Sequence, residues 1–132
     1  MWESQSSPAP SPFISIIDDD ISVRQALDRL IRSLDHDVIA FSSANEFLRY
    51  PQFTQTACLI LDVQMPGLSG IELQNVVSVL RRSIPIIFIT AHHDDDIRSR
   101  AMAAGAIGYL EKPFDEQSLI QLLDQALKPQ TK

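Results

Sequence analysis

The segment 58–70 constrains the fold of this chain more than any other stretch. The four apolar residues 58–61 predict a strand that is buried on both faces, and this strand stops at one carboxylate, Asp62. Pro66 and Gly67 then favour a turn, because proline fixes φ and glycine tolerates positive φ. In an open α/β sheet, binding sites form at the carboxyl ends of the strands. The segment therefore places Asp62 at a candidate site.

Apolar runs alternate with amphipathic segments along the rest of the chain. The apolar runs predict five strands, at 13–17, 38–41, 58–61, 86–90 and 106–110. Helical spacing of apolar residues predicts five helices, at 21–34, 43–50, 69–80, 94–104 and 115–127. Capping boxes mark the start of the second helix (Ser43 and Glu46) and of the third (Ser69 and Glu72). This alternation predicts a flavodoxin-like α/β fold: a doubly wound, five-stranded parallel sheet in the order 2-1-3-4-5, covered by five helices.

Length and composition indicate one domain in 132 residues. Residues 1–12 are rich in Ser and Pro and are expected to be disordered, residues 13–128 form the domain, and 129–132 are a short tail. The single Cys58 excludes a disulfide framework. A formal net charge of −6 argues against direct binding of nucleic acid by this domain. We expect a cytoplasmic protein, because no apolar run reaches membrane-spanning length and no signal peptide opens the chain.

Chemically active side chains end four of the five predicted strands. Asp18 and Asp19 follow the first strand, Asp62 the third, and Thr90 and Lys112 the fourth and fifth. Three carboxylates in one pocket repel each other, so we expect a hard divalent cation, magnesium or manganese, to neutralise them. A carboxylate can also accept a phosphoryl group as an acyl phosphate. The cation, the hydroxyl and the ammonium would then bind the oxygens of the transferred group.

Four motifs follow one another in order along the chain. They are Ile-Ile-Asp18-Asp19-Asp20, Leu-Asp62-Val-Gln-Met-Pro66-Gly67, Ile-Thr90-Ala91 and Glu111-Lys112-Pro113-Phe114. Together they resemble the receiver domain of bacterial two-component response regulators, and most of all the FixJ-type receivers of transcription regulators. The resemblance covers nearly the whole chain, from about residue 13 to residue 127.

The resemblance implies a role for each acid in the pocket. Asp62 would be the phosphoacceptor, receiving the phosphoryl group from a sensor histidine kinase or a phosphotransfer protein. Asp19, Asp62 and the carbonyl of Gln64 would hold the magnesium ion, with Asp18 acting through water. The domain would then be a signalling receiver, and it would catalyse only its own phosphorylation and dephosphorylation.

The resemblance also implies a conformational switch. Thr90 and Lys112 would each bind a phosphoryl oxygen, and the bond between Lys112 and Pro113 would be cis. On activation Thr90 would move toward the phosphoryl group, which would free space for Tyr109 to turn inward. This change would alter the face formed by the fourth helix, the fifth strand and the fifth helix, through which the domain would bind a partner or form a homodimer.

Two further side chains are expected to flank the path of the water that hydrolyses the acyl phosphate. Gln64 lies two residues beyond Asp62, and His92 lies two residues beyond Thr90. We expect both to tune the dephosphorylation rate. His92 and His93 are adjacent in a predicted loop, where histidines are more often simply polar than metal ligands.

Two other functions remain open from the sequence. A domain with the receiver fold can act by binding alone, without phosphorylation, although all five chemical groups are present here. A phosphoaspartyl phosphatase of the haloacid-dehalogenase kind carries Asp-x-Asp-x-Thr after its first strand, whereas this motif reads Asp62-Val-Gln64 after the third. The chain stops just after its last predicted helix, so the sequence leaves open whether an output domain follows.

Overall fold

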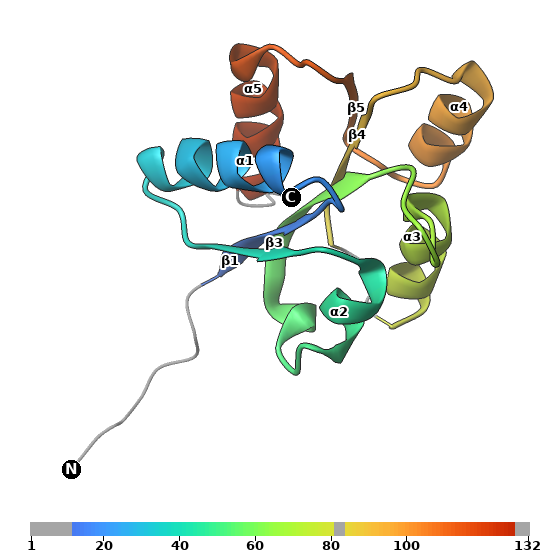
Figure 1. Ribbon diagram of the computed structural model, residues 1–132, viewed down its shortest axis with the longest axis horizontal. Coiled ribbons are helices and arrows are strands. Elements are labelled where there is room, and N and C mark those ends of the chain that lie inside the picture. The colour runs from blue at the N-terminus through green and yellow to red at the C-terminus, as the bar shows by residue number, and fades with distance from the viewer. Residues whose placement is uncertain (1–11, 81–83, 129–132) are drawn as a thin grey trace.

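The computed structural model describes residues 12–80 and 84–128, which form a parallel sheet flanked by helices (Figure 1). The strands are β1 (Phe13–Ile17), β2 (Val38–Phe41), β3 (Thr56–Asp62), β4 (Ile86–Thr90) and β5 (Gly108–Glu111). The α helices are α1 (Ile21–Ser33), α2 (Ala44–Arg49), α3 (Gly70–Leu80), α4 (Asp95–Ala103) and α5 (Glu116–Leu127). A short 3-10 helix, η1 (Phe53–Gln55), leads into β3.

The strands lie in the order β2-β1-β3-β4-β5, and every neighbouring pair is parallel. This order confirms the predicted fold. It places β1 and β3 side by side at the centre, where the direction of winding reverses. The ends of these two strands are therefore the natural place for a site.

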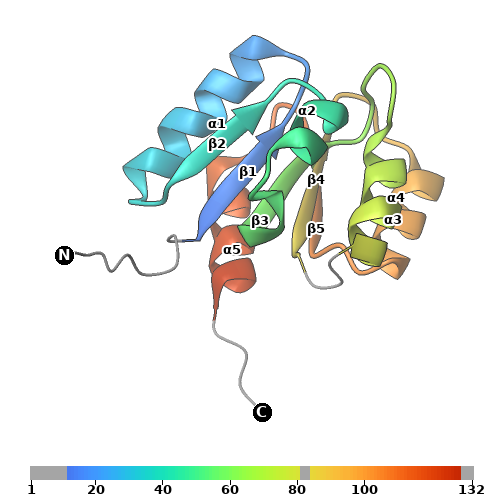
Figure 2. The same cartoon turned by 90° about the horizontal axis from the view of Figure 1, so that it is seen from below.

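Helices cover both faces of the sheet (Figure 2). The side chains of each buried strand alternate between the two faces, so both faces are apolar and both must be covered. Leu59 and Leu61 of β3 pack in the core on the side of α2, α3 and α4. Cys58 and Ile60 pack in the core on the side of α1 and α5. Cys58 is a fully buried free thiol, and burial raises its pKa to about 12, so it serves as a small apolar residue.

Two strands differ from the prediction at both ends: their starts shift by two residues, and they end one residue later, at Asp62 and Glu111. β3 begins at Thr56, two residues early, because the backbone of Thr56 already pairs with Phe13 of β1. A polar residue can occupy this buried position when its hydroxyl has a partner. The Thr56 hydroxyl lies 2.8 Å from that of Ser15 in β1. β5 begins at Gly108 rather than at residue 106, and Gly108 pairs with Ile87 of β4. An apolar run marks burial, whereas strand bounds depend on backbone pairing.

The predicted helix starts are confirmed in atomic detail. Asp20 caps α1 by accepting a hydrogen bond from the backbone N–H of Ser22 at 2.8 Å. Ser69 and Glu72 form a reciprocal capping box at the start of α3, with distances of 2.9 and 3.2 Å. None of the helices in the described part of the chain is long and apolar enough to cross a bilayer. Except for residue 12, the predicted disordered segment and tail lie outside the described residues.

Candidate functional site

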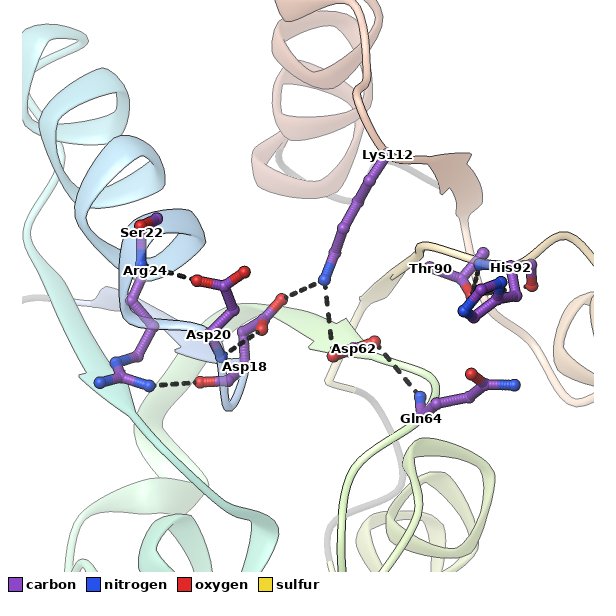
Figure 3. Close-up of polar contacts among 9 residues, drawn as sticks. All are labelled: Asp18, Asp20, Ser22, Arg24, Asp62, Gln64, Thr90, His92 and Lys112. Carbon is purple, nitrogen blue, oxygen red and sulfur yellow. Dashed lines mark hydrogen bonds and ion pairs between the residues drawn. The ribbon is translucent and has the colours of Figure 1, made fainter.

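The carboxyl ends of four strands bring the predicted site residues to one edge of the sheet (Figure 3). Asp18 follows β1, Asp62 ends β3, Thr90 ends β4 and Lys112 follows β5. Asp18 and Thr90 are 0% exposed and Asp62 is 4% exposed, so these polar groups lie inside the fold rather than on its surface. Buried polar groups of this kind require partners, and the partners decide the chemistry.

The three acids of the pocket form a tight cluster. One carboxylate oxygen of each of Asp18, Asp19 and Asp62 lies within 4.8 Å of the others. Asp19 is exposed, whereas the other two are buried. Hard oxygen ligands at this spacing fit a small divalent cation such as magnesium, which also keeps several waters. The exposed Asp19 leaves the cluster open to solvent on one side, which suits such partial hydration.

Burial and the neighbouring charges change the acidity of Asp62. Burial is the largest cause, and together with the negative charge of Asp18 it raises the pKa of Asp62 from 3.8 to about 6. The charge of Lys112 and a hydrogen bond from the backbone N–H of Gln64, at 3.2 Å, act in the opposite direction. Without a cation, Asp62 therefore holds its proton more tightly than an ordinary aspartate.

The ammonium group of Lys112 lies between two acids. Its Nζ is 2.8 Å from Oδ2 of Asp18 and 3.5 Å from Oδ2 of Asp62 (Figure 3). Burial alone would lower the pKa of this amine, but the hydrogen bond to Asp18 and the charges of both acids outweigh it and raise the pKa. Lys112 is therefore a permanent cation inside the acid pocket. The bond between Lys112 and Pro113 is cis, as predicted.

The hydroxyl of Thr90 points into the loop between β4 and α4. It donates to the carbonyl of His92 at 3.0 Å and accepts from the N–H of the same residue at 3.1 Å. Thr90 thus sits at the predicted edge, but its hydroxyl is bound to the loop rather than to the acids. To bind a phosphoryl oxygen, it would have to leave these two contacts.

The side chains of Gln64 and His92 are exposed, and Figure 3 shows them on the same side of Asp62 as the β4–α4 loop. The described contacts of Gln64 at this site involve its backbone N–H, which donates to Asp62. Both side chains are thus free to meet solvent near the phosphoacceptor candidate. Their effect on hydrolysis remains a prediction.

Comparison with known proteins decides the family. Residues 14–124 match the response regulator receiver domain. The chain belongs to this family. The resemblance inferred from the four motifs is therefore confirmed, and a receiver domain of a response regulator is a signalling module. The family assignment also leaves no support for the phosphatase alternative.

Curated relatives of this receiver domain are response regulators and transcriptional regulators. Nodulation protein W of Bradyrhizobium diazoefficiens is 46% identical over 107 residues, which cover 81% of this chain and 47% of that protein. The response regulator protein TodT of Pseudomonas putida is 44% identical, covering 87% of this chain and 51% of that protein. The transcriptional regulatory protein FixJ of B. diazoefficiens is 36% identical, with 87% and 56% covered. The chain thus spans about half the length of these relatives.

Solved structures agree with the fold. The response regulator StyR is 44% identical with a TM-score of 0.80, covering 89% of this chain and 60% of that one. The crystal structure of FixJ-N is 31% identical with a TM-score of 0.80, covering 93% of this chain and 98% of that one. The receiver fold therefore accounts for nearly all of the domain described here.

Tyr109 of this receiver domain already lies partly inside the fold. Its hydroxyl oxygen is buried, its ring packs against the core on the side of α2, α3 and α4, and burial raises the pKa of its phenol. The expected inward turn on activation would therefore start from a ring that is already partly buried. The role of Tyr109 as a switch stays a prediction.

His93 makes contacts with α4 and β5 that the sequence did not reveal. Its ring lies edge-on to Tyr109, with centroids 6.1 Å apart. Its Nε2 is 2.6 Å from Asp95 of α4, and its Nδ1 is 3.2 Å from Glu111 of β5. His93 therefore joins the β4–α4 loop to the end of β5 beside Tyr109. An adjacent pair of histidines in a loop carries no sequence signal for such a contact.

Gly70, the first residue of α3, lies close against the backbone of Asp62. A Cβ atom on Gly70 would lie 2.5 Å from the backbone oxygen of Asp62 and 3.1 Å from the ring of Phe88. The absence of a side chain lets α3 start directly against the end of β3. Gly70 follows the Ser69 cap in sequence, and the sequence signal, a glycine inside a helix, is too common to identify this role.

Proposed function

We propose that Asp62 accepts a phosphoryl group from a phosphohistidine of a sensor histidine kinase or of a phosphotransfer protein. A carboxylate oxygen of Asp62 attacks phosphorus, the bond between phosphorus and the histidine nitrogen breaks, and the electron pair leaves with the imidazole. The product is an acyl phosphate on Asp62. Family membership supports this function, and so does the burial of Asp62 at the end of a central strand.

The position of Lys112 is the observation that carries the proposal. Its Nζ lies 3.5 Å from Oδ2 of Asp62 and 2.8 Å from Oδ2 of Asp18. A fixed positive charge therefore lies next to the place where the oxygens of the incoming phosphoryl group would be bound. A preorganised cation of this kind stabilises charge that develops on a transferred phosphoryl group. An ordinary surface lysine would not be held between two buried acids.

The acid cluster is proposed to hold magnesium or manganese. Asp18, Asp19 and Asp62 offer the carboxylates, with Asp18 acting through water, and the Gln64 carbonyl is the proposed further ligand. The cation, when bound, would neutralise charge on the transferred group. Thr90 would bind one phosphoryl oxygen after leaving its contacts with His92.

The proposed output surface is the face formed by α4, β5 and α5. Tyr109 of β5 lies beside His93, which contacts both α4 and β5, so a shift of Thr90 at the end of β4 could alter this region. We propose that phosphorylation changes partner binding or homodimer formation through this face. Analytical ultracentrifugation and NMR amide spectra, each recorded with and without beryllofluoride, would test this proposal. An unchanged oligomeric state together with unchanged amide chemical shifts on this face would reject it.

Intact-mass analysis tests the phosphoacceptor. After treatment with acetyl phosphate and magnesium, the wild-type protein is expected to gain one phosphoryl group, and Asp62→Asn none. The matched control is Asp20→Asn, because Asp20 neighbours the pocket, serves as a helix cap and can be replaced by the equally good cap Asn. A phosphoryl group on Asp62→Asn would move the acceptor elsewhere. A wild type that gains none, from small donors or from a kinase, would favour a receiver that acts by binding alone.

A further inference from the structure

The backbone carbonyl of Asp18 is held by a side chain from helix α1. Strand β1 ends at Ile17, and the N–H of Asp18 still donates to the carbonyl of Phe41 in β2 at 3.2 Å. The carbonyl oxygen of Asp18 instead accepts a hydrogen bond from Nη1 of Arg24, at 2.7 Å (Figure 3). A charged donor at this distance makes one of the stronger kinds of hydrogen bond in proteins.

Three polar atoms of Asp18 are hydrogen-bonded, and the fourth, Oδ2, is paired with the ammonium of Lys112. Besides these two backbone contacts, its Oδ1 accepts from the N–H of Asp20 at 2.8 Å, and its Oδ2 lies 2.8 Å from Nζ of Lys112. Arg24 contributes the one contact in this set that comes from within a helix. It therefore ties the body of α1 to the loop that carries the acids.

The geometry of the peptide bond makes this contact important for two acids at once. The carbonyl of Asp18 belongs to the peptide that links Asp18 to Asp19, and a peptide group is planar. Holding its oxygen fixes the plane, and with it the direction in which the chain leaves toward Asp19. The relative positions of the two carboxylates in the cluster therefore depend on Arg24.

The charge of Arg24 does not stabilise the helix end at which it lies. Arg24 is the fourth residue of α1, whose first turn contains no acidic residue. A positive charge at a helix N-terminus interacts unfavourably with the helix dipole. The contact with the Asp18 carbonyl offsets this cost, and it lies beside the acid pocket.

We propose that Arg24 is a positioning residue for the cation site: its guanidinium orients the Asp18–Asp19 peptide and so sets the two carboxylates for a divalent cation. The identity of the bound cation rests on the proposed function. Arg24 would touch neither the cation nor the phosphoryl group. It acts through the backbone of Asp18, as partners in the outer shell of a metal site do.

Two physical effects of removing Arg24 have opposite signs, which makes the proposal testable. Loss of a positive charge near the acids would by Coulomb's law strengthen binding of a cation. Loss of the anchor would weaken it, because the acids would no longer be preorganised. Weaker binding therefore indicates positioning and cannot arise from charge.

The test measures magnesium binding to the full unphosphorylated chain by isothermal titration calorimetry. We expect the Kd of Arg24→Gln to rise about tenfold, the lower end of the range for outer-shell partners. Arg24→Lys keeps the charge but loses the planar fork, so its Kd should lie between those of Arg24→Gln and the wild type. In NMR spectra of the magnesium-free protein, the backbone amide signal of Asp19 should differ between Arg24→Gln and the wild type, because this amide belongs to the peptide that Arg24 holds.

Arg32 provides a matched control on the same helix. Its Nη2 donates to the carbonyl of Val38 at 3.1 Å, also six residues away, but at the far end of α1 from the acids. Arg32→Gln loses the same kind of contact and the same charge, and in addition the ion pair of Arg32 with Asp28, which also lies away from the acids. Its magnesium Kd should stay within about twofold of the wild type, as for sites that do not couple.

The outcomes separate the positioning role of Arg24 from the proposed function. A Kd for Arg24→Gln equal to or below that of the wild type would overturn the positioning role, whatever happens to its thermal stability. If Arg24→Gln does not fold, Arg24→Lys decides alone, and a wild-type Kd would overturn the role. A wild type that binds magnesium but is not phosphorylated would reject the proposed function only. A wild type that does not bind magnesium would overturn both.

Discussion

The ammonium nitrogen of Lys112 lies closer to Asp18 than to Asp62, at 2.8 Å against 3.5 Å. Lys112 therefore occupies the acid pocket as an internal counter-charge when no phosphoryl group is present. Its main partner is Asp18, which is completely buried. Magnesium and Lys112 would both relieve the same repulsion among the acids, so their effects on stability should be coupled.

Replacing Lys112 should make the fold depend on magnesium. In chelator, Lys112→Met should lower the free energy of unfolding by about 3 kcal/mol, because a buried carboxylate loses its partner. Added magnesium should recover more stability in this variant than in the wild type. Urea unfolding with EDTA and with magnesium measures both effects, and Lys128→Met, at the exposed end of α5, is the control. Equal gains in the variant and the wild type would show that Lys112 and the cation act independently.

Magnesium should stabilise the unmodified protein through the acid cluster. It relieves repulsion among Asp18, Asp19 and Asp62, so the melting temperature of the wild type should rise with added metal. Asp19→Ala removes the exposed ligand and should abolish most of this rise. Calorimetric melts over a magnesium series provide the measurement. The same rise in Asp19→Ala would place the metal elsewhere.

The raised pKa of Asp62 predicts a pH dependence of stability in chelator. The folded carboxyl, with a pKa of about 6 against 3.8, binds more protons than the unfolded one between about pH 4 and 6. The free energy of unfolding therefore falls as pH rises through this window, and the penalty persists above it. Asp62→Asn lacks this contribution, so its stability advantage over the wild type should grow from pH 4 to 6 and then level off. Urea unfolding of both proteins in EDTA measures this difference, and an advantage independent of pH would contradict the prediction.

Gly70→Ala should damage the site by moving α3. The added methyl group would meet the backbone oxygen of Asp62 at 2.5 Å, and backbone cannot yield as a flexible side chain does. We expect a loss of about 2 kcal/mol in the free energy of unfolding, which is typical of overpacking. Phosphorylation by acetyl phosphate should also be slower. Gly67→Asn is the control, because Gly67 has a φ of 80° in open space and Asn tolerates that backbone. A fully stable Gly70→Ala would show that α3 has room to shift.

Gln64 and His92 should set how long the phosphorylated state lasts. Both side chains are exposed on the side of Asp62 that faces the β4–α4 loop, where they can orient the attacking water or obstruct it. Gln64→Ala or His92→Ala should change the dephosphorylation half-life several-fold, equivalent to about 1 kcal/mol in the barrier. Both variants should still accept the phosphoryl group. Intact-mass analysis over time measures these half-lives. If both variants have the half-life of the wild type, neither side chain takes part in dephosphorylation.

Local sequence patterns were sufficient for the fold and for the edge at which the site lies. Apolar runs mark buried strands, helical periodicity marks the covering helices, and Ser69 with Glu72 marks the start of α3. These signals depend on residues that are close together in the sequence, so they can be recognised without the tertiary structure. Parallel strands then carry whatever follows them to a common edge, which is why Asp62 and Lys112 could be expected to meet.

Contacts between distant segments were decided only by the tertiary structure. The preference of Lys112 for Asp18, the bond from Arg24 to the Asp18 carbonyl and the bridge from His93 to Glu111 all depend on where side chains point after packing. The early start of β3 likewise depends on the pairing of the Thr56 backbone with Phe13 of β1. Sequence patterns specify which face of an element is buried. Angles and distances between elements follow from close packing of the whole core, and no local pattern contains them.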